Sequence, residues 1–575
     1  MALRPPREGP VQAAHGQIGV LGSLRSLSRL PREQALSRLG YAVKQPIFGL
    51  PIYHYTLNGR GPTALMVTPS DPWPGNAEIG AAIVHGSFIL LGQELRTPVP
   101  LWHPIGASRR WCETLNGFSW LRDLRAAGGD AARRSARELV MLWLDDNERW
   151  DALTWDPVVT GQRLAHWLGQ YEFFAASAEV DFRHHLLHAM SCQARHLSRV
   201  LPAGIAGAPA ITALKGLIYA GACLPGAEAC AERGLELLGQ ELPRQLMADG
   251  GHIERSPARH MEVLRDLIDI RATLASGDIE IPQDLQTAIE QMTPILRLFL
   301  HGDGGLAQFN GSSEAEAWKI EMLLQRALGR SRPLMSAPQS GFQRLQSGRT
   351  VVIVDAGQPP SPIHDAHTHA GALSFEMSVG RERLIVNCGA QTGDGDWALV
   401  QRATAAHSTL VLCDTNSCEL RPEGGLGRRR ANVTCRRDES EGHVWLDLSH
   451  DGYLPNFGLT HHRRLYLAKG GDDLRGEDRI EGSGDGTFAI RFHLHPRVSA
   501  SLVKSGDTAL LRLTKGGGWR FHAKGAELRL EPSVYLGANG EVRRSQQIVL
   551  LGLIDSGKTT VKWALRREAK TQSRR

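Results

Sequence analysis

The spacing of apolar residues changes near residue 335 and divides the chain into two predicted domains. Between about Asp130 and Leu328 apolar residues recur at helical spacing, as in Ala136, Val140 and Trp143. Helices are expected near residues 132–143, 158–176, 182–200, 211–223, 227–247, 257–275, 283–301 and 314–328, with breaks that contain Gly, Pro or Asp. We therefore predict a helical domain of paired hairpins over residues 1–335.

After about Gln339 the apolar residues alternate with polar ones, which is typical of half-buried strands. Phe488, Ile490 and Phe492 alternate in this way, and His493 and His495 are expected to be exposed polar positions of the same strand. Further strands are expected near residues 350–354, 384–387, 443–448, 460–467 and 547–553. Residues 336–575 should form an antiparallel β-sandwich, so the fold class is α+β in two domains.

Hydropathy and charge narrow the class of protein. The longest apolar run, Ala81 to Leu91, is interrupted by His85 and is too short to cross a membrane, which predicts a soluble protein without a transmembrane segment. Near the N-terminus Arg25 follows the apolar residues from Ile18 too closely for a clear signal peptide. The formal net charge of +6 is compatible with an anionic partner but does not identify it.

Eight cysteines are scattered along the chain without any Cys-x-x-Cys pair or zinc-finger spacing. We interpret them as mostly free, buried thiols. The chain also has 13 Trp, a share that suits a carbohydrate-facing surface, although packing in the core is the commoner use.

The first candidate site is the polar segment from Asp249 to His260, which lies between two predicted helices. Ser256 and Pro257 are a favourable helix start, because serine caps a helix and proline is tolerated in its first turn. The residues before and after this start are unusually rich in charge and imidazole: His252, Glu254, Arg255, Arg259 and His260. The segment either presents a base and a cation to a substrate or is an ion-paired loop that connects two helical hairpins.

The second candidate site is the segment from His364 to Glu376. In an extended chain His367 and His369 point to the same side, and two such imidazoles are a common half of a zinc site. A further ligand would come from elsewhere, and His407 is the leading candidate. The alternative is that these histidines are surface or hydrogen-bonded groups.

One sequence pattern near the C-terminus resembles a phosphate-binding loop in its letters alone. Residues 552–559 match the letters of a phosphate-binding loop, but they fall between two predicted strands and not between a strand and a long helix. We interpret them as a hairpin turn.

Several segments together resemble the heparinase II/III-like family of polysaccharide lyases. They are residues 71–75 (DPWPG), 214–221 (LKGLIYAG), 249–260, 306–311 (LAQFNG), 369–376 (HAGALSFE), 384–389 (LIVNCG) and 402–409. The resemblance implies an N-terminal (α/α) toroid, a C-terminal β-sandwich and an active cleft where they meet. It also implies cleavage of uronate-containing polysaccharides by β-elimination, in which a base removes the proton next to a neutralised carboxylate and an acid protonates the leaving oxygen.

The sequence departs from this family at positions that matter for the chemistry. Ala208 and Pro209 stand where the better-known members have an Asn-His pair, and Arg259 replaces their catalytic Tyr. Arginine cannot act as a base, but it can neutralise a carboxylate. By resemblance His367 matches a catalytic histidine, so the candidate catalytic residues are His252, Arg255, Arg259, His260 and His367, with Glu254 and Arg402 as substrate-binding residues.

The resemblance also implies a structural zinc ion, for which His369 and His407 match ligands. The third ligand, usually acidic, falls on Asn387, and the usual Asp two residues after His369 is Gly371. Both changes predict a weakened or absent zinc site.

The leading hypothesis is a lyase acting on an anionic polysaccharide or oligosaccharide such as a glycosaminoglycan, with Arg255 or Arg259 holding the carboxylate. The alternative is an envelope-associated, glycan-binding protein of the same fold that has lost elimination chemistry. Nucleic acid is not an expected partner. The family resemblance implies the periplasm or cell envelope, and the lack of a clear signal peptide leaves the cytoplasm as the alternative.

Overall fold

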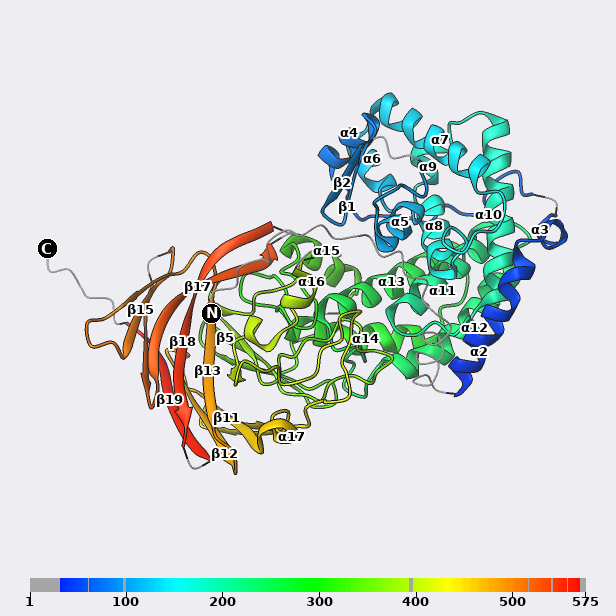
Figure 1. The fold of residues 1–575 in the computed structure, drawn as a ribbon. Coiled ribbons are helices and arrows are strands. Elements are labelled where there is room, and N and C mark those ends of the chain that lie inside the picture. The colour runs from blue at the N-terminus through cyan, green and yellow to red at the C-terminus, as the bar shows by residue number, and fades with distance from the viewer. Residues whose placement is uncertain are drawn as a thin grey trace, which may run out of the picture. The chain divides into compact units, whose positions relative to one another are not determined.

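The computed structural model describes residues 32–59, 61–96, 100–329, 331–391, 397–515, 517–538, 541–555 and 557–568. Their contacts form two compact units (Figure 1). The helical unit holds residues 32–245 and 262–289, and the sheet-rich unit holds residues 246–261 and everything described from 290 onward. Residues 18–25, on which the signal-peptide prediction depends, lie outside the described residues.

Helices make up nearly all of the helical unit. Their bounds are α2 (Arg32–Phe48), α3 (Pro51–Leu57), α4 (Ala77–Val84), α5 (Arg109–Asn116), α6 (Leu121–Ala127), α7 (Gly129–Asp146), α8 (Pro157–Gly169), α9 (Tyr171–Phe174), α10 (Val180–Val200), α11 (Ala208–Cys223) and α12 (Glu228–Gln245). A short hairpin of β1 (Ser87–Leu90) and β2 (Gln93–Arg96) interrupts them. The unit boundary falls within α13 (Pro257–Ser276) and α14 (Gln283–Leu298), while α15 (Ala317–Arg326) belongs to the sheet-rich unit.

Close helix packing and buried tryptophans build the core of the helical unit. A side chain at Gly216 of α11 would come within 2.2 Å of the Gly161 carbonyl of α8, so glycine allows the two helices to touch. Trp143 and Trp167 are each about 1% exposed or less and meet edge to face. Most of the tryptophans of the described residues are buried in this way, so packing accounts for their number.

Two antiparallel sheets form the sheet-rich unit. One has the strand order β14-β15-β16-β19-β12-β11-β10-β9, and the other has the order β17-β18-β13-β7-β6-β5-β4-β3 with β8 paired to β13. The first contains β9 (Val433–Ser440), β10 (His443–His450), β11 (Leu459–Leu467), β12 (Asp473–Gly482), β14 (Ser499–Leu502), β15 (Thr508–Arg512), β16 (Gly518–Lys524) and β19 (Lys558–Arg567). The second contains β3 (Ser336–Ala337), β4 (Phe342–Ser347), β5 (Thr350–Asp355), β6 (Phe375–Val379), β7 (Glu382–Val386), β8 (Leu410–Leu412), β13 (Gly486–Leu494), β17 (Glu527–Ala538) and β18 (Glu541–Ile554).

Aromatic side chains join the two sheets face to face. Phe375 of β6 stacks on Trp563 of β19 with ring centroids 5.7 Å apart, and Phe492 of β13 meets the same indole at 4.9 Å. The inward-facing residues of both sheets belong to one apolar core, as expected for a sandwich. The α+β order read from the two periodicities is therefore present in the structure.

Two local predictions need correction. His493 and His495 are 1% and 8% exposed, because loops cover the end of β13: His493 Nε2 lies 3.0 Å from the Ala405 carbonyl, and His495 Nε2 lies 3.3 Å from Glu314. Residues 552–559 hold the end of β18, a turn closed by an antiparallel bridge between Asp555 and Lys558, and the start of β19. Because β18 and β19 belong to different sheets, this turn connects two sheets and not the two strands of one hairpin.

All eight cysteines are free thiols, and five of them are buried. Among the described helices, none is both long enough and apolar enough to cross a bilayer.

Candidate active site

The segment from Asp249 to His260 is anchored to the start of the sandwich. The Asp249 carboxylate accepts hydrogen bonds from the amide and hydroxyl of Ser340 at 2.8 and 3.1 Å. The helix that follows begins at Pro257, as the Ser-Pro pair predicts. Its first turn is also capped from elsewhere in the chain, because Ala258 N donates to Ser312 Oγ at 3.0 Å.

Two of the candidate arginines have structural roles. Arg255, 4% exposed, donates to the carbonyls of Ser340 and Gln358 and forms a buried ion pair with Asp355. Arg402, 6% exposed, donates to the Gly425 carbonyl at 2.5 Å and to two further backbone carbonyls. Guanidinium groups that are already occupied by buried partners are poorly placed to hold a substrate carboxylate.

The two histidines of this segment are buried. His252 is 2% exposed and its Nδ1 accepts from the Glu254 amide at 3.4 Å, while His260 Nε2 bonds to the Met292 carbonyl at 2.8 Å. Burial lowers the pKa of His252 well below its usual value and that of His260 to about 4. Both imidazoles are therefore neutral at pH 7. Glu254 is buried as well, at 6% exposure.

Arg259 and His367 remain partly accessible and lie next to each other. The structure places an Arg259 guanidinium nitrogen 2.9 Å from His367 Nε2, and both side chains are half-buried. Because arginine only donates hydrogen bonds, Nε2 of His367 is the acceptor and carries no proton. Of the five candidate catalytic residues, these two form the one accessible pair in the described part of the chain.

Asn310 connects the two candidate segments and was not singled out from the sequence. Its Nδ2 donates to the Arg255 carbonyl at 2.8 Å, and its Oδ1 accepts from the His369 amide at 3.1 Å. It has a positive φ of 47°, which asparagine tolerates better than most residues. One buried amide therefore fixes the turn that precedes α13, the helix of Arg259, relative to the segment of His367.

The predicted metal ligands His369 and His407 bond to each other. His369 Nδ1 lies 3.1 Å from His407 Nε2, and His407 Nδ1 lies 2.8 Å from the Ala403 carbonyl. His407 thus donates through Nδ1 and accepts through Nε2. Burial, reinforced by the second imidazole, lowers the pKa of His369 well below its usual value.

Asn387 is not available as a third ligand. Its Oδ1 accepts from the Ser408 amide at 3.0 Å and its Nδ2 donates to the Gln308 carbonyl at 3.3 Å. Within the described ranges no group of three or more His, Cys, Asp or Glu side chains could hold a metal ion. Besides the two imidazoles, the described residues therefore supply no acidic third ligand for the zinc site that the family resemblance implies.

We expect chelator treatment to leave the protein unchanged. Dialysis against a strong chelator should shift the thermal midpoint by less than about 1 °C, because a ligand that is not bound contributes nothing to stability. The measurement is calorimetry of the full chain, paired with elemental analysis for zinc. One zinc per chain that disappears in the His407→Ala variant would contradict this expectation.

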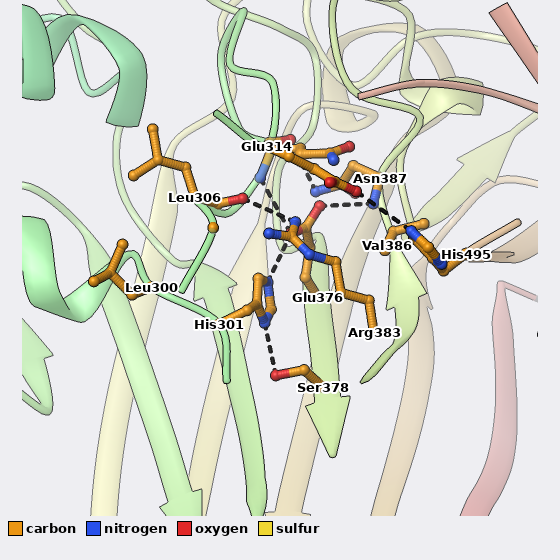
Figure 2. A network of polar contacts seen from close by, with 12 residues as sticks. Leu300, His301, Leu306, Glu314, Glu376, Ser378, Arg383, Val386, Asn387 and His495 are labelled. Carbon is orange, nitrogen blue, oxygen red and sulfur yellow. Dashed lines mark hydrogen bonds and ion pairs between the residues drawn. The ribbon is translucent and has the colours of Figure 1, made fainter. Parts of the chain in front are cut away.

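A buried carboxylate organises the backbone around this site. Glu376 of β6 is fully buried and accepts from His301 Nε2 at 2.9 Å, from the Gln308 amide at 3.1 Å and from the Asn387 amide at 2.8 Å. Figure 2 shows His301 between Glu376 and Ser378. Glu376 thereby fixes the strand that leads to Asn387 and the loop that carries Asn310.

Neighbouring polar side chains extend this network. Glu314 lies beside His495, and Arg383 donates to the Leu306 carbonyl at 2.9 Å (Figure 2). Burial alone would raise the pKa of Glu314, but His495, Arg383 and Tyr535 outweigh it and hold the pKa at about 2. These groups stabilise the sheet-rich unit, and of the four the sequence pattern pointed to His495 alone, as an exposed strand position.

The helical unit has no acid or base at the two altered positions. Ala208 and Pro209 form the first turn of α11, and Ala208 is 5% exposed. Farther along the helix, Lys215 is buried between Asp266 and Asp269, with Nζ–O distances of 3.0 and 2.6 Å. Neither Ala208 nor Pro209 has a side chain that can transfer a proton.

A helical unit joined to a β-sandwich is the fold of several solved polysaccharide lyase structures. Similar solved structures include heparinase III, with a TM-score of 0.66 and 16% identity over 81% of this chain and 79% of that chain. A mutant of the heparan sulfate lyase HepC from Pedobacter heparinus has a TM-score of 0.62 and 16% identity over 94% and 88% of the two chains. At these identities the likeness concerns the fold.

The sequence then assigns the family. Residues 132–328 match the heparinase II/III N-terminus, and residues 329–564 match the heparinase II/III-like C-terminal domain. The chain belongs to the heparinase II/III-like family, as the sequence motifs predicted. It is also 32% identical over 513 residues to FtsZ-localized protein C of Caulobacter vibrioides (strain NA1000 / CB15N), covering 85% of this chain and 88% of that protein.

Proposed function

We propose that this protein binds the carboxylate of an acidic glycan through Arg259 and that it has lost efficient β-elimination. The observation that carries the proposal is the 2.9 Å contact between the Arg259 guanidinium and His367 Nε2. The guanidinium is the group of this site best suited to a carboxylate, because it is permanently charged and its parallel N–H groups match the two oxygens.

The same contact opposes elimination. A general base needs a free lone pair, and that of His367 Nε2 accepts from a cation. The other two candidate histidines are buried, and Ala208 and Pro209 have no proton to transfer. The chain therefore retains a group that can neutralise a carboxylate, while its groups for moving protons are engaged or replaced.

Elimination is the competing function, and family membership favours it. A bound glycan carboxylate could take over the Arg259 guanidinium and release His367 Nε2 to act as the base. In that case activity would depend on His367 as well as on Arg259. The two functions thus predict different consequences for the same pair of residues.

Removing the guanidinium should weaken glycan binding. For Arg259→Ala we expect the dissociation constant for heparan sulfate or alginate oligosaccharides to rise about tenfold or more, since a hydrogen bond to a charged group contributes about 1.5–3 kcal/mol. Arg259→Lys should lie between the wild type and alanine. Calorimetric titration of the full chain measures the effect.

The matched control removes an arginine elsewhere on the sheet-rich unit. Arg436 of β9 is exposed, and Arg436→Ala removes the same charge without touching the Arg259–His367 pair. Equal losses of affinity in both variants would point to unspecific attraction by net charge. Unchanged affinity in Arg259→Ala would refute the proposed site.

The relative from Caulobacter favours a second role. We propose that this protein, like FtsZ-localized protein C, localises with FtsZ, which supports the cytoplasmic location over the envelope. We expect a fluorescent fusion expressed in its native cells to coincide with labelled FtsZ and to disperse when FtsZ is depleted. Uniform fluorescence in dividing cells would contradict this role.

A further inference from the structure

The outer side of α2 and α3 carries a concentration of solvent-facing apolar side chains. In the described part of the chain, seven large apolar side chains between residues 36 and 55 are exposed: Leu36, Leu39, Val43, Ile47, Leu50, Ile52 and Tyr55. Leu36 and Val43 are 69% and 68% exposed, and Tyr55 is 77% exposed. Scattered single exposures are ordinary, whereas a contiguous series marks an interaction surface.

Helix α2 is amphipathic in the opposite sense from an ordinary surface helix. It packs on its own unit through Ser37, whose hydroxyl accepts from the Gly204 amide at 3.0 Å, and through Phe48, which contacts the rings of Tyr53 and Trp150. At 3.6 residues per turn the exposed Leu36, Leu39, Val43 and Ile47 fall within an arc of about 80°, and the inner positions Ser37 and Phe48 lie about 120° away around the helix. The apolar stripe that would normally face the core faces outward.

The charges of α2 indicate what covers this stripe. Arg32 and Lys44 are exposed beside the apolar stripe, whereas Arg38 lies on the side of the helix that packs against Gly204. The acidic residue of its first turn, Glu33, pairs with Arg244 at 3.0 Å. A second copy packed on this stripe would bring like charges together, which is unfavourable. An apolar face flanked by cations instead complements a surface that is apolar below and anionic above.

Helix α3 continues the surface beyond Pro51. Ile52 is 70% exposed, and Tyr55 presents an apolar ring with a polar hydroxyl, a combination suited to the boundary between lipid headgroups and acyl chains. The inner side of α3 is fixed, because Tyr53 Oη lies 2.8 Å from His196 Nδ1 and Trp150 N donates to His54 at 3.0 Å. The exposed face is therefore held in place by the helical unit.

We propose that the α2–α3 apolar face, defined by Leu36, Leu39, Val43, Ile47, Ile52 and Tyr55, is a docking surface for a membrane that contains anionic lipids. The helices lie in the plane of the interface and do not cross the bilayer. The surface belongs to the helical unit and does not depend on the glycan site proposed above.

Vesicle binding by the full chain tests this surface. We expect the protein to float with phosphatidylcholine vesicles that contain phosphatidylglycerol, and to bind pure phosphatidylcholine less well. The Leu39→Asp/Val43→Asp double variant should lose at least about tenfold in vesicle affinity, because a charge in the buried stripe opposes insertion. Both side chains are exposed in the free protein, so the fold should be retained.

A matched variant controls for added negative charge. Leu142 of α7 is 48% exposed, nearly the same as Leu39 at 49%, and lies in the same unit. Leu142→Asp should keep vesicle binding and the wild-type circular dichroism spectrum. The proposal is overturned if the full chain binds none of the vesicles, if the double variant binds as well as Leu142→Asp, or if the double variant instead converts a dimer into a monomer.

Discussion

Replacing Glu376 with alanine should destabilise the sheet-rich unit by about 3–5 kcal/mol, the range expected when a fully buried charged group loses its place in a network. The carboxylate accepts from His301 Nε2 and from the backbone amides of Gln308 and Asn387. Each of the three donors would be left buried without this acceptor, at a cost of about 1–3 kcal/mol apiece before relaxation. Urea denaturation of the full chain, with a signal from the sheet, measures the loss.

Ser378→Ala is the matched control for Glu376. The Ser378 hydroxyl lies 2.9 Å from the other nitrogen of His301, so its removal affects the same imidazole but spares both amides. We expect a cost of about 1–2 kcal/mol, because the hydroxyl loses its bond to His301 and a long hydrogen bond from the Gly302 amide at 3.4 Å. Equal costs for the two variants would mean that Glu376 does not organise the loop around Asn310.

Replacing Lys215 with methionine should destabilise the helical unit by a similar amount, about 3–5 kcal/mol. Lys215, Asp266 and Asp269 have side chains that are 8%, 8% and 5% exposed, and the variant leaves both carboxylates without their shared cation. Burial alone would lower the pKa of Lys215, but the two carboxylates outweigh it and raise the pKa. The measurement is the free energy of unfolding obtained from urea titration.

A double-mutant cycle separates this ion pair from packing. Adding Asp266→Asn to Lys215→Met removes one uncompensated charge, so the double variant should be more stable than Lys215→Met alone. Arg233→Met, at an exposed pair of the same unit, should cost less than about 1 kcal/mol. Additive losses at Lys215 and Asp266 would contradict the proposed coupling.

The Lys215–Asp266 ion pair also makes the free energy of unfolding depend on pH. Burial tends to raise the pKa of Asp266, but Lys215 and Arg265 outweigh it and lower the pKa below its usual value. The stabilisation is therefore complete above the unfolded-state pKa of about 4 and is lost as the pH falls through the lower folded-state value. In Lys215→Met this loss on acidification should be smaller than in the wild type.

Local sequence patterns predicted the elements well because each pattern is a property of neighbouring residues. The alternation around Phe488 and Ile490 predicted β13, and the Ser-Pro pair predicted the start of α13 at Pro257. The pattern could not show that β18 and β19 belong to different sheets, because the turn residues are compatible with both a hairpin and a crossing.

The site was harder to predict because its key contacts join distant residues. The charge density of the Asp249–His260 segment fitted both an ion-paired loop and a substrate site. In the structure each interpretation holds for a different arginine of the segment. Arg255 pairs with Asp355, 100 residues away, whereas Arg259 stays partly accessible beside His367. Nothing in the local sequence distinguishes these two arginines.

Asn310 and Glu376 illustrate the same limit. Both lie in segments that carry the family resemblance, yet neither has a neighbour in sequence that reveals its role. Their partners, the backbone amides of His369, Gln308 and Asn387, become visible once the chain is folded. A family motif can thus mark a structural residue as readily as a catalytic one.

The central claim is that the Arg259–His367 pair binds acidic glycans without cleaving them. The most direct measurement incubates the wild-type protein with glycosaminoglycans, alginate and bacterial acidic polysaccharides, and follows the ultraviolet absorbance of the unsaturated product alongside calorimetric binding. We predict binding to at least one glycan, with no rise in absorbance over several pH values. A rise in absorbance that disappears in His367→Ala would contradict the claim and identify an active lyase.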